Sequence, residues 1–196
     1  MEWSYCDIRD LSQKEYDSIY QSLTPSRKEH IDRFLREDDR KRSLAGEYII
    51  KKLLSDKFGI TDASIERLPN GRPILNGANL FISISHCDDI VVCAVSEKET
   101  GIDTERIKPI KLSLIKRFCV TEEKEYILKN SPYSKTLPYC DDKEILDRFY
   151  EIWTAKEAYF KMLGTGIKDL KSVNVLNLKI TKFYINDYLM QIVSKE

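Results

Sequence analysis

Stretches of helical hydrophobic periodicity alternate with short strand-like runs along the chain, and this alternation limits the possible folds more than any other feature. Apolar residues recur at helical spacing in residues 24–58, 111–129 and 143–163. Runs typical of strands occupy residues 80–86, 90–95, 173–178, 180–185 and 189–193. The pattern predicts an α+β fold, with a hairpin formed by the first two strands.

The polar segment at residues 96–101 is the best candidate for a boundary inside the chain. It predicts two domains of similar length, residues 1–100 and 101–196. Within the first, the helical stretch is expected to break near residues 37–39 and to end at Gly59.

Charge and cysteine content exclude several classes of function. Acidic and basic residues balance, with 32 of each, so no overall field attracts nucleic acid or a membrane surface. The five cysteines show no CxxC spacing, which is typical of reduced thiols rather than of a zinc site. No signal pattern or membrane span is visible, and a cytoplasmic protein is expected.

Three carboxylates in two short segments suggest a metal site. Asp103 and Glu105 are two residues apart, so an extended backbone points both to one side. Glu157 follows about fifty residues later, in a helical segment. Oxygen ligands suit Mg²⁺ or Mn²⁺ better than zinc. The alternative is that these are ordinary solvated surface acids.

Glu157 and Lys161 are four residues apart and therefore neighbours on a helix. Taken alone they form an ordinary surface ion pair. Beside a cation and a phosphate, Glu157 could complete the metal shell while Lys161 neutralises a phosphate oxygen. Trp153 and Phe149 look like core residues.

Four ordered segments carry a resemblance to a known family. They are Gly-Arg-Pro at 71–73, Phe-Ile-Ser-Ile-Ser-His at 81–86, Gly-Ile-Asp-Thr-Glu at 101–105 and Trp-Thr-Ala-Lys-Glu-Ala-Tyr-Phe-Lys at 153–161. The chain resembles the phosphopantetheinyl transferases of the Sfp type. The resemblance implies two similar α/β halves related by a pseudo-twofold axis, coenzyme A bound between them, and a monomer.

The reaction that the resemblance implies moves 4′-phosphopantetheine from coenzyme A to a serine of an acyl or peptidyl carrier protein, releasing adenosine 3′,5′-bisphosphate. Mg²⁺ would be held by Asp103, Glu105 and Glu157, and Lys161 would hold a phosphate. Glu123 is the expected proton acceptor, although a metal-bound water that passes its proton to Glu123 or Glu157 is equally open.

The resemblance also implies a set of coenzyme A contacts. His30 and Arg72 depart from the family pattern, since lysine is usual at both positions. The nucleotide end and the phosphates are expected to contact Arg27, His30, Arg42, Ser43, Arg72, Ser85, His86, Lys156 and Lys161.

The carrier protein is expected to dock near residues 112–126 and 130–142, with Lys116, Tyr133 and Lys135 as candidate contacts. Two other classes stay open: a Mg²⁺-dependent phosphodiesterase or nuclease, and a non-catalytic coenzyme A-binding regulator. The first leaves the Ser-His and Gly-Arg-Pro segments unexplained, and the intact carboxylates argue against the second.

Overall fold

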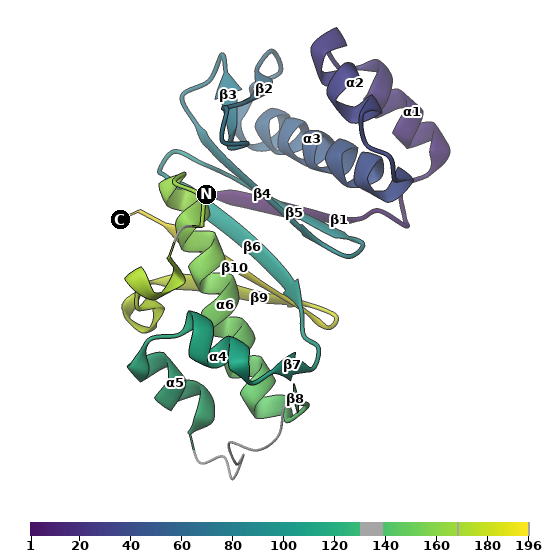
Figure 1. Ribbon diagram of the computed structural model, residues 1–196. Helices are drawn as coiled ribbons and strands as arrows, with labels where there is room; N and C mark the ends of the chain where they lie inside the picture. Colours follow the sequence, from purple (N-terminus) through teal and green to yellow (C-terminus); the bar gives the residue numbers. More distant parts are fainter. Residues whose placement is uncertain (130–138, 168, 196) are drawn as a thin grey trace. The chain divides into compact units, whose positions relative to one another are not determined.

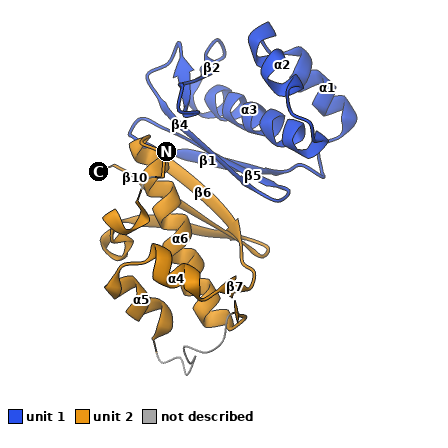
Figure 2. Cartoon of the chain, viewed as in Figure 1, with its two compact units in different colours: residues 1–100 blue, residues 101–196 orange. Residues whose placement is uncertain are grey.

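A computed structural model describes residues 1–129, 139–167 and 169–195 of the chain. It divides into two compact units, Met1–Thr100 and Gly101–Glu196, each of which is described by itself (Figure 2). No helix within the described residues is both long enough and apolar enough to cross a membrane.

The N-terminal unit is a three-stranded sheet covered by one long helix (Figure 1). The strand order is β1-β5-β4, with β1 at Glu2–Asp7, β5 at Ile90–Ser96 and β4 at Phe81–Cys87. Both pairings are antiparallel, which confirms the predicted hairpin. The helix α3 (Glu37–Phe58) packs against this sheet, and every residue of the central strand β5 is buried.

Smaller elements complete this unit: α1 (Gln13–Gln21), α2 (Pro25–Asp32), β2 (Ser64–Arg67) and β3 (Pro73–Asn76). The predicted helix at 24–58 is therefore two helices, and its break falls at residues 33–36, just before the expected position. Gly59 ends α3 as predicted, with φ of 66° in the left-handed region that favours glycine.

The C-terminal unit has the strand order β6-β10-β9 and one long helix, α6 (Lys143–Leu163). Its strands are β6 (Thr100–Arg106), β9 (Ile180–Ile185) and β10 (Tyr188–Ser194). The bounds of α6 agree with the predicted helix. An Asp142 side chain that accepts a bond from the Ile145 N–H begins the helix, and Gly164 ends it.

Two predicted elements of this unit are wrong. The helix expected at 111–129 is divided into α4 (Ser113–Phe118) and α5 (Thr121–Leu128), because Val120 has an extended backbone. The strand expected at 173–178 is replaced by two short 3₁₀ turns, η1 (Leu170–Ser172) and η2 (Val175–Asn177).

Side-chain caps explain both 3₁₀ turns. Asp169 accepts a hydrogen bond from the Lys171 N–H at the start of η1, and Asn174 does the same for Leu176 in η2. Such local bonds compete with strand pairing. A two-stranded ladder, β7 (Ile110–Lys111) with β8 (Tyr139–Cys140), completes the described elements.

The two units share one arrangement of elements. In each, the first strand of the unit pairs with the last, the last pairs with the one before it, and a helix of 22 or 21 residues packs against the sheet. The central strands β5 and β10 are the most deeply buried in each case. The chain is thus α+β with two similar halves.

Candidate active site

The carboxylates predicted as metal ligands lie on two elements of the C-terminal unit, β6 and α6. A glycine allows these elements to approach closely. A Cβ atom at Gly101 would lie 1.9 Å from the backbone oxygen of Ala158 and 2.5 Å from the backbone nitrogen of Met162. Only a residue without a side chain fits there. The strand consequently runs against the turn of α6 that carries Glu157 and Lys161.

Asp103 is held by Lys161. The lysine Nζ lies 2.7 Å from Asp103 Oδ1, and the Asp103 side chain is almost fully buried. A buried carboxylate needs such a partner because burial removes its hydration. The predicted phosphate ligand and one predicted metal ligand are therefore in direct contact in this structure.

Glu105, two residues further along β6, has a different kind of partner. The indole Nε1–H of Trp153 donates a hydrogen bond to Glu105 Oε1 at 3.1 Å. Trp153 is half-buried, so the expectation of a plain core residue misses this contact. The sequence does contain an indication of this contact: Trp153 lies one helical turn before Glu157, and so on the same face of the helix.

Glu157 is also near both β6 carboxylates. Burial raises its pKa to about 7, and the charges of Asp103 and Glu105 add to this rise while Lys161 opposes it. A divalent cation would relieve the repulsion, and the all-oxygen donor set fits a hard ion. Among the described residues, however, no three acidic, His or Cys side chains are gathered closely enough to hold a metal as they stand.

Glu123 and Lys156 lie away from this cluster, in the interior of the unit. The two are 2.8 Å apart and essentially unexposed. Lys156 Nζ also donates to the carbonyls of Leu170 and Val173, at 2.5 and 2.7 Å. Glu123 accepts from the backbone N–H groups of Val120 and Val175, at 2.9 and 3.0 Å, so each of its oxygens has a partner.

This arrangement favours a structural role for the pair over the roles suggested by the sequence. A proton acceptor must reach the attacking hydroxyl, and a coenzyme contact must reach solvent. Buried and bonded to α5, η1 and η2, Glu123 and Lys156 instead brace the segments that follow α6.

Several predicted coenzyme contacts gather in the N-terminal unit. Arg27 donates to Glu47 through Nε at 2.9 Å and to Ser43 through Nη2 at 2.9 Å. Beside it, a cavity of about 420 Å³ is lined by Arg27, His30 and Arg67, together with Thr24, Ser26, Ser64, Ile65 and Glu66. The cavity thus brings predicted Arg27 and His30 together with a third basic residue.

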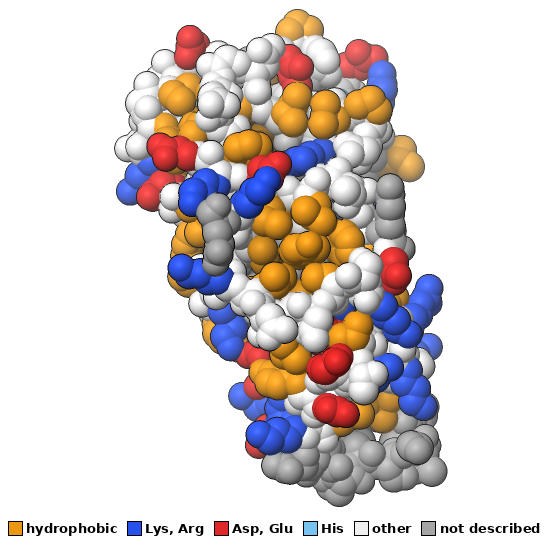
Figure 3. Space-filling view, turned by 90° about the vertical axis from the view of Figure 1, so that its left-hand side faces the viewer, with side chains coloured by type: hydrophobic (Ala, Val, Ile, Leu, Met, Phe, Trp, Pro, Cys, Tyr) orange, Lys and Arg blue, Asp and Glu red, His pale blue; other side chains and the backbone are white. Residues whose placement is uncertain are grey.

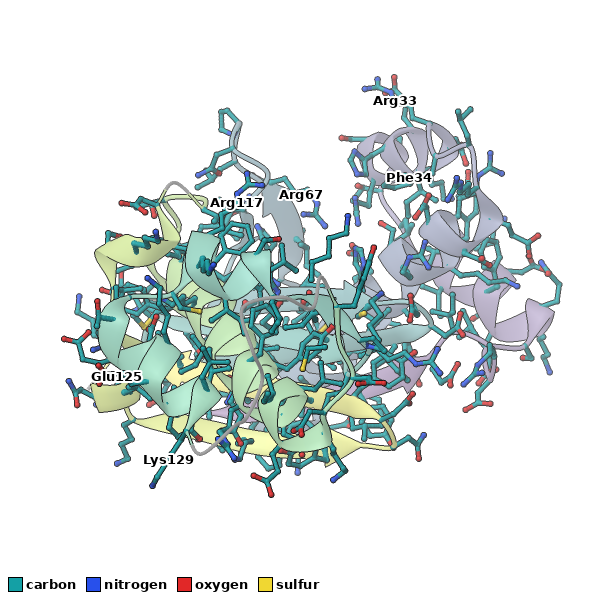
Figure 4. All side chains as sticks on the ribbon, turned by 60° about the horizontal axis from the view of Figure 1, so that its bottom comes forward. Arg33, Phe34, Arg67, Arg117, Glu125 and Lys129 are labelled. Carbon is teal, nitrogen blue, oxygen red and sulfur yellow. The ribbon has the colours of Figure 1, made fainter. Side chains whose placement is uncertain are left out.

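Arg67, on β2, was not predicted (Figure 4). Arg67 lies close enough to His30 to affect its pKa. Burial is the main cause that lowers the His30 pKa, and the charges of Arg27 and Arg67 lower it further. A positive potential of this kind attracts phosphate. No spacing in the sequence relates β2 to α2, so the contact could not be foreseen.

Arg42 and His86 share a second area of the same unit. Arg42 donates to the Asp88 carbonyl at 2.8 Å and to Asp39 at 2.5 Å. The hydrogen bond from Arg42 is the largest cause of the lowered pKa of Asp39, and the charge of His86 contributes. Ser85 is buried while His86 is exposed, as alternation along β4 requires, so the two side chains leave opposite faces of the strand.

Arg72 lies in the turn between β2 and β3, where its carbonyl accepts a hydrogen bond from the Leu68 N–H at 2.9 Å.

Of the candidate carrier contacts, Lys116 is exposed on α4, whereas Tyr133 and Lys135 lie outside the described residues. On the face seen in Figure 3, hydrophobic side chains gather in a central patch, and basic and acidic side chains lie around it.

Comparison with known proteins gives matches over nearly the whole chain. The family model described as the 4′-phosphopantetheinyl transferase superfamily matches residues 99–195. A second model, 4′-phosphopantetheinyl transferase, N-terminal, matches residues 10–98. The two models meet where the structure divides into its two units.

Individual relatives agree with these models. The 4′-phosphopantetheinyl transferase Sfp of Bacillus subtilis is 30% identical over 162 residues, which are 81% of this chain and 68% of the relative. HetI of Nostoc, also a 4′-phosphopantetheinyl transferase, is 27% identical over 85% of this chain and 70% of its own length. The rat L-aminoadipate-semialdehyde dehydrogenase-phosphopantetheinyl transferase is 29% identical over 85% of this chain and 57% of its own.

Proposed function

Because the chain belongs to the 4′-phosphopantetheinyl transferase superfamily, we propose that it transfers 4′-phosphopantetheine from coenzyme A to a serine hydroxyl of a carrier protein. The single observation that carries the proposal is the meeting of two family motifs in one unit, where Asp103 and Glu105 on β6 lie against the turn of α6 that bears Glu157 and Lys161. Adenosine 3′,5′-bisphosphate is the expected product.

Asp103, Glu105 and Glu157 are the proposed ligands of a divalent cation, Mg²⁺ or Mn²⁺. When bound, such an ion supplies positive charge that offsets the negative charge of the coenzyme A pyrophosphate. The three carboxylates lie on β6 and on the turn of α6 that it faces, where burial and the charges of Asp103 and Glu105 raise the pKa of Glu157. Asp103, which is paired with the Lys161 ammonium, would hold the cation, and Lys161 would neutralise a phosphate oxygen.

Glu157 is better suited than Glu123 to accept the proton of the carrier serine. Glu157 lies beside Asp103 and Glu105 at the proposed cation site, and so in the part of the unit where the transfer is proposed to occur. Glu123 is enclosed, and its oxygens are occupied by Lys156 and two backbone N–H groups. The attacking nucleophile is the carrier serine, so no protein nucleophile is required.

The N-terminal unit is proposed to bind the nucleotide end of coenzyme A. Support comes from the basic lining of the 420 Å³ cavity, where Arg27, His30 and Arg67 offer donors to a phosphate. Arg42, Ser43, Arg72, Ser85 and His86 remain proposed contacts. The enzyme is proposed to act as a monomer in the cytoplasm, where the cysteines, none of which forms a disulfide within the described residues, would stay reduced.

The experiment that tests the proposal measures the intact mass of a carrier protein. The full chain is incubated with coenzyme A, MgCl₂ and several apo carriers of the acyl and peptidyl types. A mass gain of one phosphopantetheinyl group, absent with EDTA and with a carrier whose acceptor serine is replaced by alanine, is expected. Unchanged mass for every carrier type would overturn the proposal, and hydrolysis of coenzyme A without transfer would indicate a phosphodiesterase.

A further inference from the structure

The indole ring of Trp153 is held on two sides by other aromatic rings. Phe149, one turn earlier on α6, stacks on it with centroids 6.2 Å apart and an interplanar angle of 20°. Phe118, at the end of α4, meets it edge-on at 5.0 Å and 62°. Contacts of this geometry are favourable and restrict ring rotation. The direction of the Trp153 N–H is therefore fixed by packing.

That N–H points at a proposed metal ligand, since it donates to Glu105 Oε1 at 3.1 Å. An indole N–H is a neutral donor, so it orients a carboxylate without cancelling its charge. A carboxylate oxygen accepts more than one partner, which leaves acceptor capacity for a cation. At Asp103, by comparison, the partner is the ammonium of Lys161, which neutralises the carboxylate and would compete with a cation for it.

Trp153 also shares a helical face with Glu157, four residues later, and with Phe149, four residues earlier. The same side of α6 thus supplies one proposed ligand and the group that orients another. Phe at position 153 would keep an aromatic ring that can pack against Phe149 and Phe118. The N–H is the part of the side chain that only tryptophan adds.

We propose that Trp153 is a positioning residue for the metal site, whose indole N–H restricts the orientation of the Glu105 carboxylate, a proposed ligand of the cation. The inference rests on the proposed function, because it needs Glu105 to be a ligand. It assigns no chemical step to Trp153. Residues that orient metal ligands through hydrogen bonds typically change metal affinity by about 10–100-fold when replaced.

Metal binding by the full chain tests the proposal directly. Mn²⁺ binding in the presence of coenzyme A is followed through the electron paramagnetic resonance signal of the free ion. The Trp153→Phe variant keeps an aromatic ring and removes the N–H, and it is expected to bind Mn²⁺ about tenfold more weakly with little change in melting temperature. In turnover, the Mg²⁺ concentration for half-maximal rate should rise by a similar factor while the rate at saturating Mg²⁺ stays close to wild type.

Trp3→Phe is the matched control, because the chain has two tryptophans and Trp3 lies on β1 of the other unit. This variant should bind Mn²⁺ like wild type. It also leaves Trp153 as the sole tryptophan, so its emission should change with the same midpoint as Mn²⁺ binding.

A double-variant cycle separates an effect through Glu105 from an effect on packing. Glu105→Gln alone should weaken Mn²⁺ binding, and adding Trp153→Phe should weaken it no further. Additive losses, or wild-type affinity in Trp153→Phe, would overturn the inference while leaving the proposed transfer intact. If wild type binds no Mn²⁺, the inference is also overturned, and carrier modification decides separately whether the proposed function stands.

Discussion

At the scale of single residues, the three motif carboxylates differ in what holds them. Asp103 is paired with an ammonium, and Glu105 accepts a hydrogen bond from a neutral indole. The pKa of Glu157 is raised first by burial and then by the charges of Asp103 and Glu105, which Lys161 opposes. Each is therefore expected to respond differently to replacement. Replacement of Glu157 is the most informative test, because its surroundings disfavour the charged form of its side chain.

The Glu157→Gln variant is expected to stay folded and to lose about a thousandfold in transfer rate, which corresponds to about 4 kcal/mol of activation free energy. The amide keeps the shape of the side chain and removes the charge that a cation needs. Single-turnover transfer to an apo carrier measures the loss. Glu97→Gln, an exposed glutamate outside the site, is the control. Wild-type turnover in Glu157→Gln would show that this residue is neither ligand nor proton acceptor.

Replacement of Lys156 by methionine is expected to lower the free energy of unfolding by about 3–5 kcal/mol, because it leaves the buried Glu123 carboxylate without its counter-ion. The double variant Lys156→Met with Glu123→Gln should be more stable than Lys156→Met alone, since it also removes the buried negative charge of Glu123. Urea denaturation measures both. A stable single variant with only a raised KM for coenzyme A would instead support the original prediction that Lys156 contacts the coenzyme.

Sequence reasoning succeeded at this scale where spacing carries the information. The i, i+2 pair on β6 and the i, i+4 pair on α6 are local, so their faces follow from the period of each element. The partnership of Glu123 with Lys156 joins residues 33 positions apart on different elements, and no periodicity predicts it. Arg67 was missed for the same reason.

At the scale of elements, the spacing between β6 and α6 depends on Gly101. Gly101→Ala would place a methyl group 1.9 Å from the Ala158 carbonyl, so the strand or the helix must move. We expect a loss of stability of at least about 1–3 kcal/mol. Transfer activity should also fall, because Asp103 and Lys161 would move apart. Thermal unfolding and the carrier mass assay measure the two effects.

Gly46→Ala, in the other long helix, is the matched control. Its new methyl group would lie 3.3 Å from the Ile84 side chain, which can shift, and alanine is the better helix former. This change should be close to neutral in stability. Equal losses in the two variants would show that the close approach at Gly101 has no special importance.

The elements with strong end signals were those predicted best. Asp142 and Gly164 mark both ends of α6, and its predicted bounds agree with the structure. Residues 173–178 carry strand-forming side chains, yet the caps at Asp169 and Asn174 turn the backbone before a strand can form. Hydrophobic pattern alone does not reveal such local competition.

At the scale of the whole molecule, the raised pKa of Glu157 connects the site to global stability. Its pKa is about 7 in the folded chain and 4.5 ordinarily, so the folded state binds the proton more tightly. The free energy of unfolding should then fall as pH rises from about 4.5 to 7 and lose nothing further from this group above that range. The loss is on the order of 1–3 kcal/mol.

Denaturant unfolding of the full chain in EDTA at pH 5, 6, 7 and 8 measures this dependence. The Glu157→Gln variant has no carboxyl group to ionise, so its stability advantage over wild type should grow between pH 5 and 7. Added Mg²⁺ should reduce that advantage at pH 8 by stabilising only the wild type. Parallel pH curves for the two proteins would contradict the assigned cause.

The α+β class and the similarity of the two halves followed from the sequence, because alternating periodicities and family motifs extend along most of the chain. What periodicity could not supply was the pairing of β6 with β10, which joins the two ends of the second unit. These two strands are neighbours in space but far apart in the sequence, so their pairing is determined by tertiary packing.

The identical strand order of the two units also bears on ancestry. A gene that doubled in tandem would leave this connectivity twice, each copy with its own helix-covered sheet. After such an event one copy is free to drift as long as the other preserves the chemistry. In this chain the acidic motif residues lie on β6 and α6 of the second unit, whereas the basic residues Arg27, His30 and Arg67 line a cavity of the first.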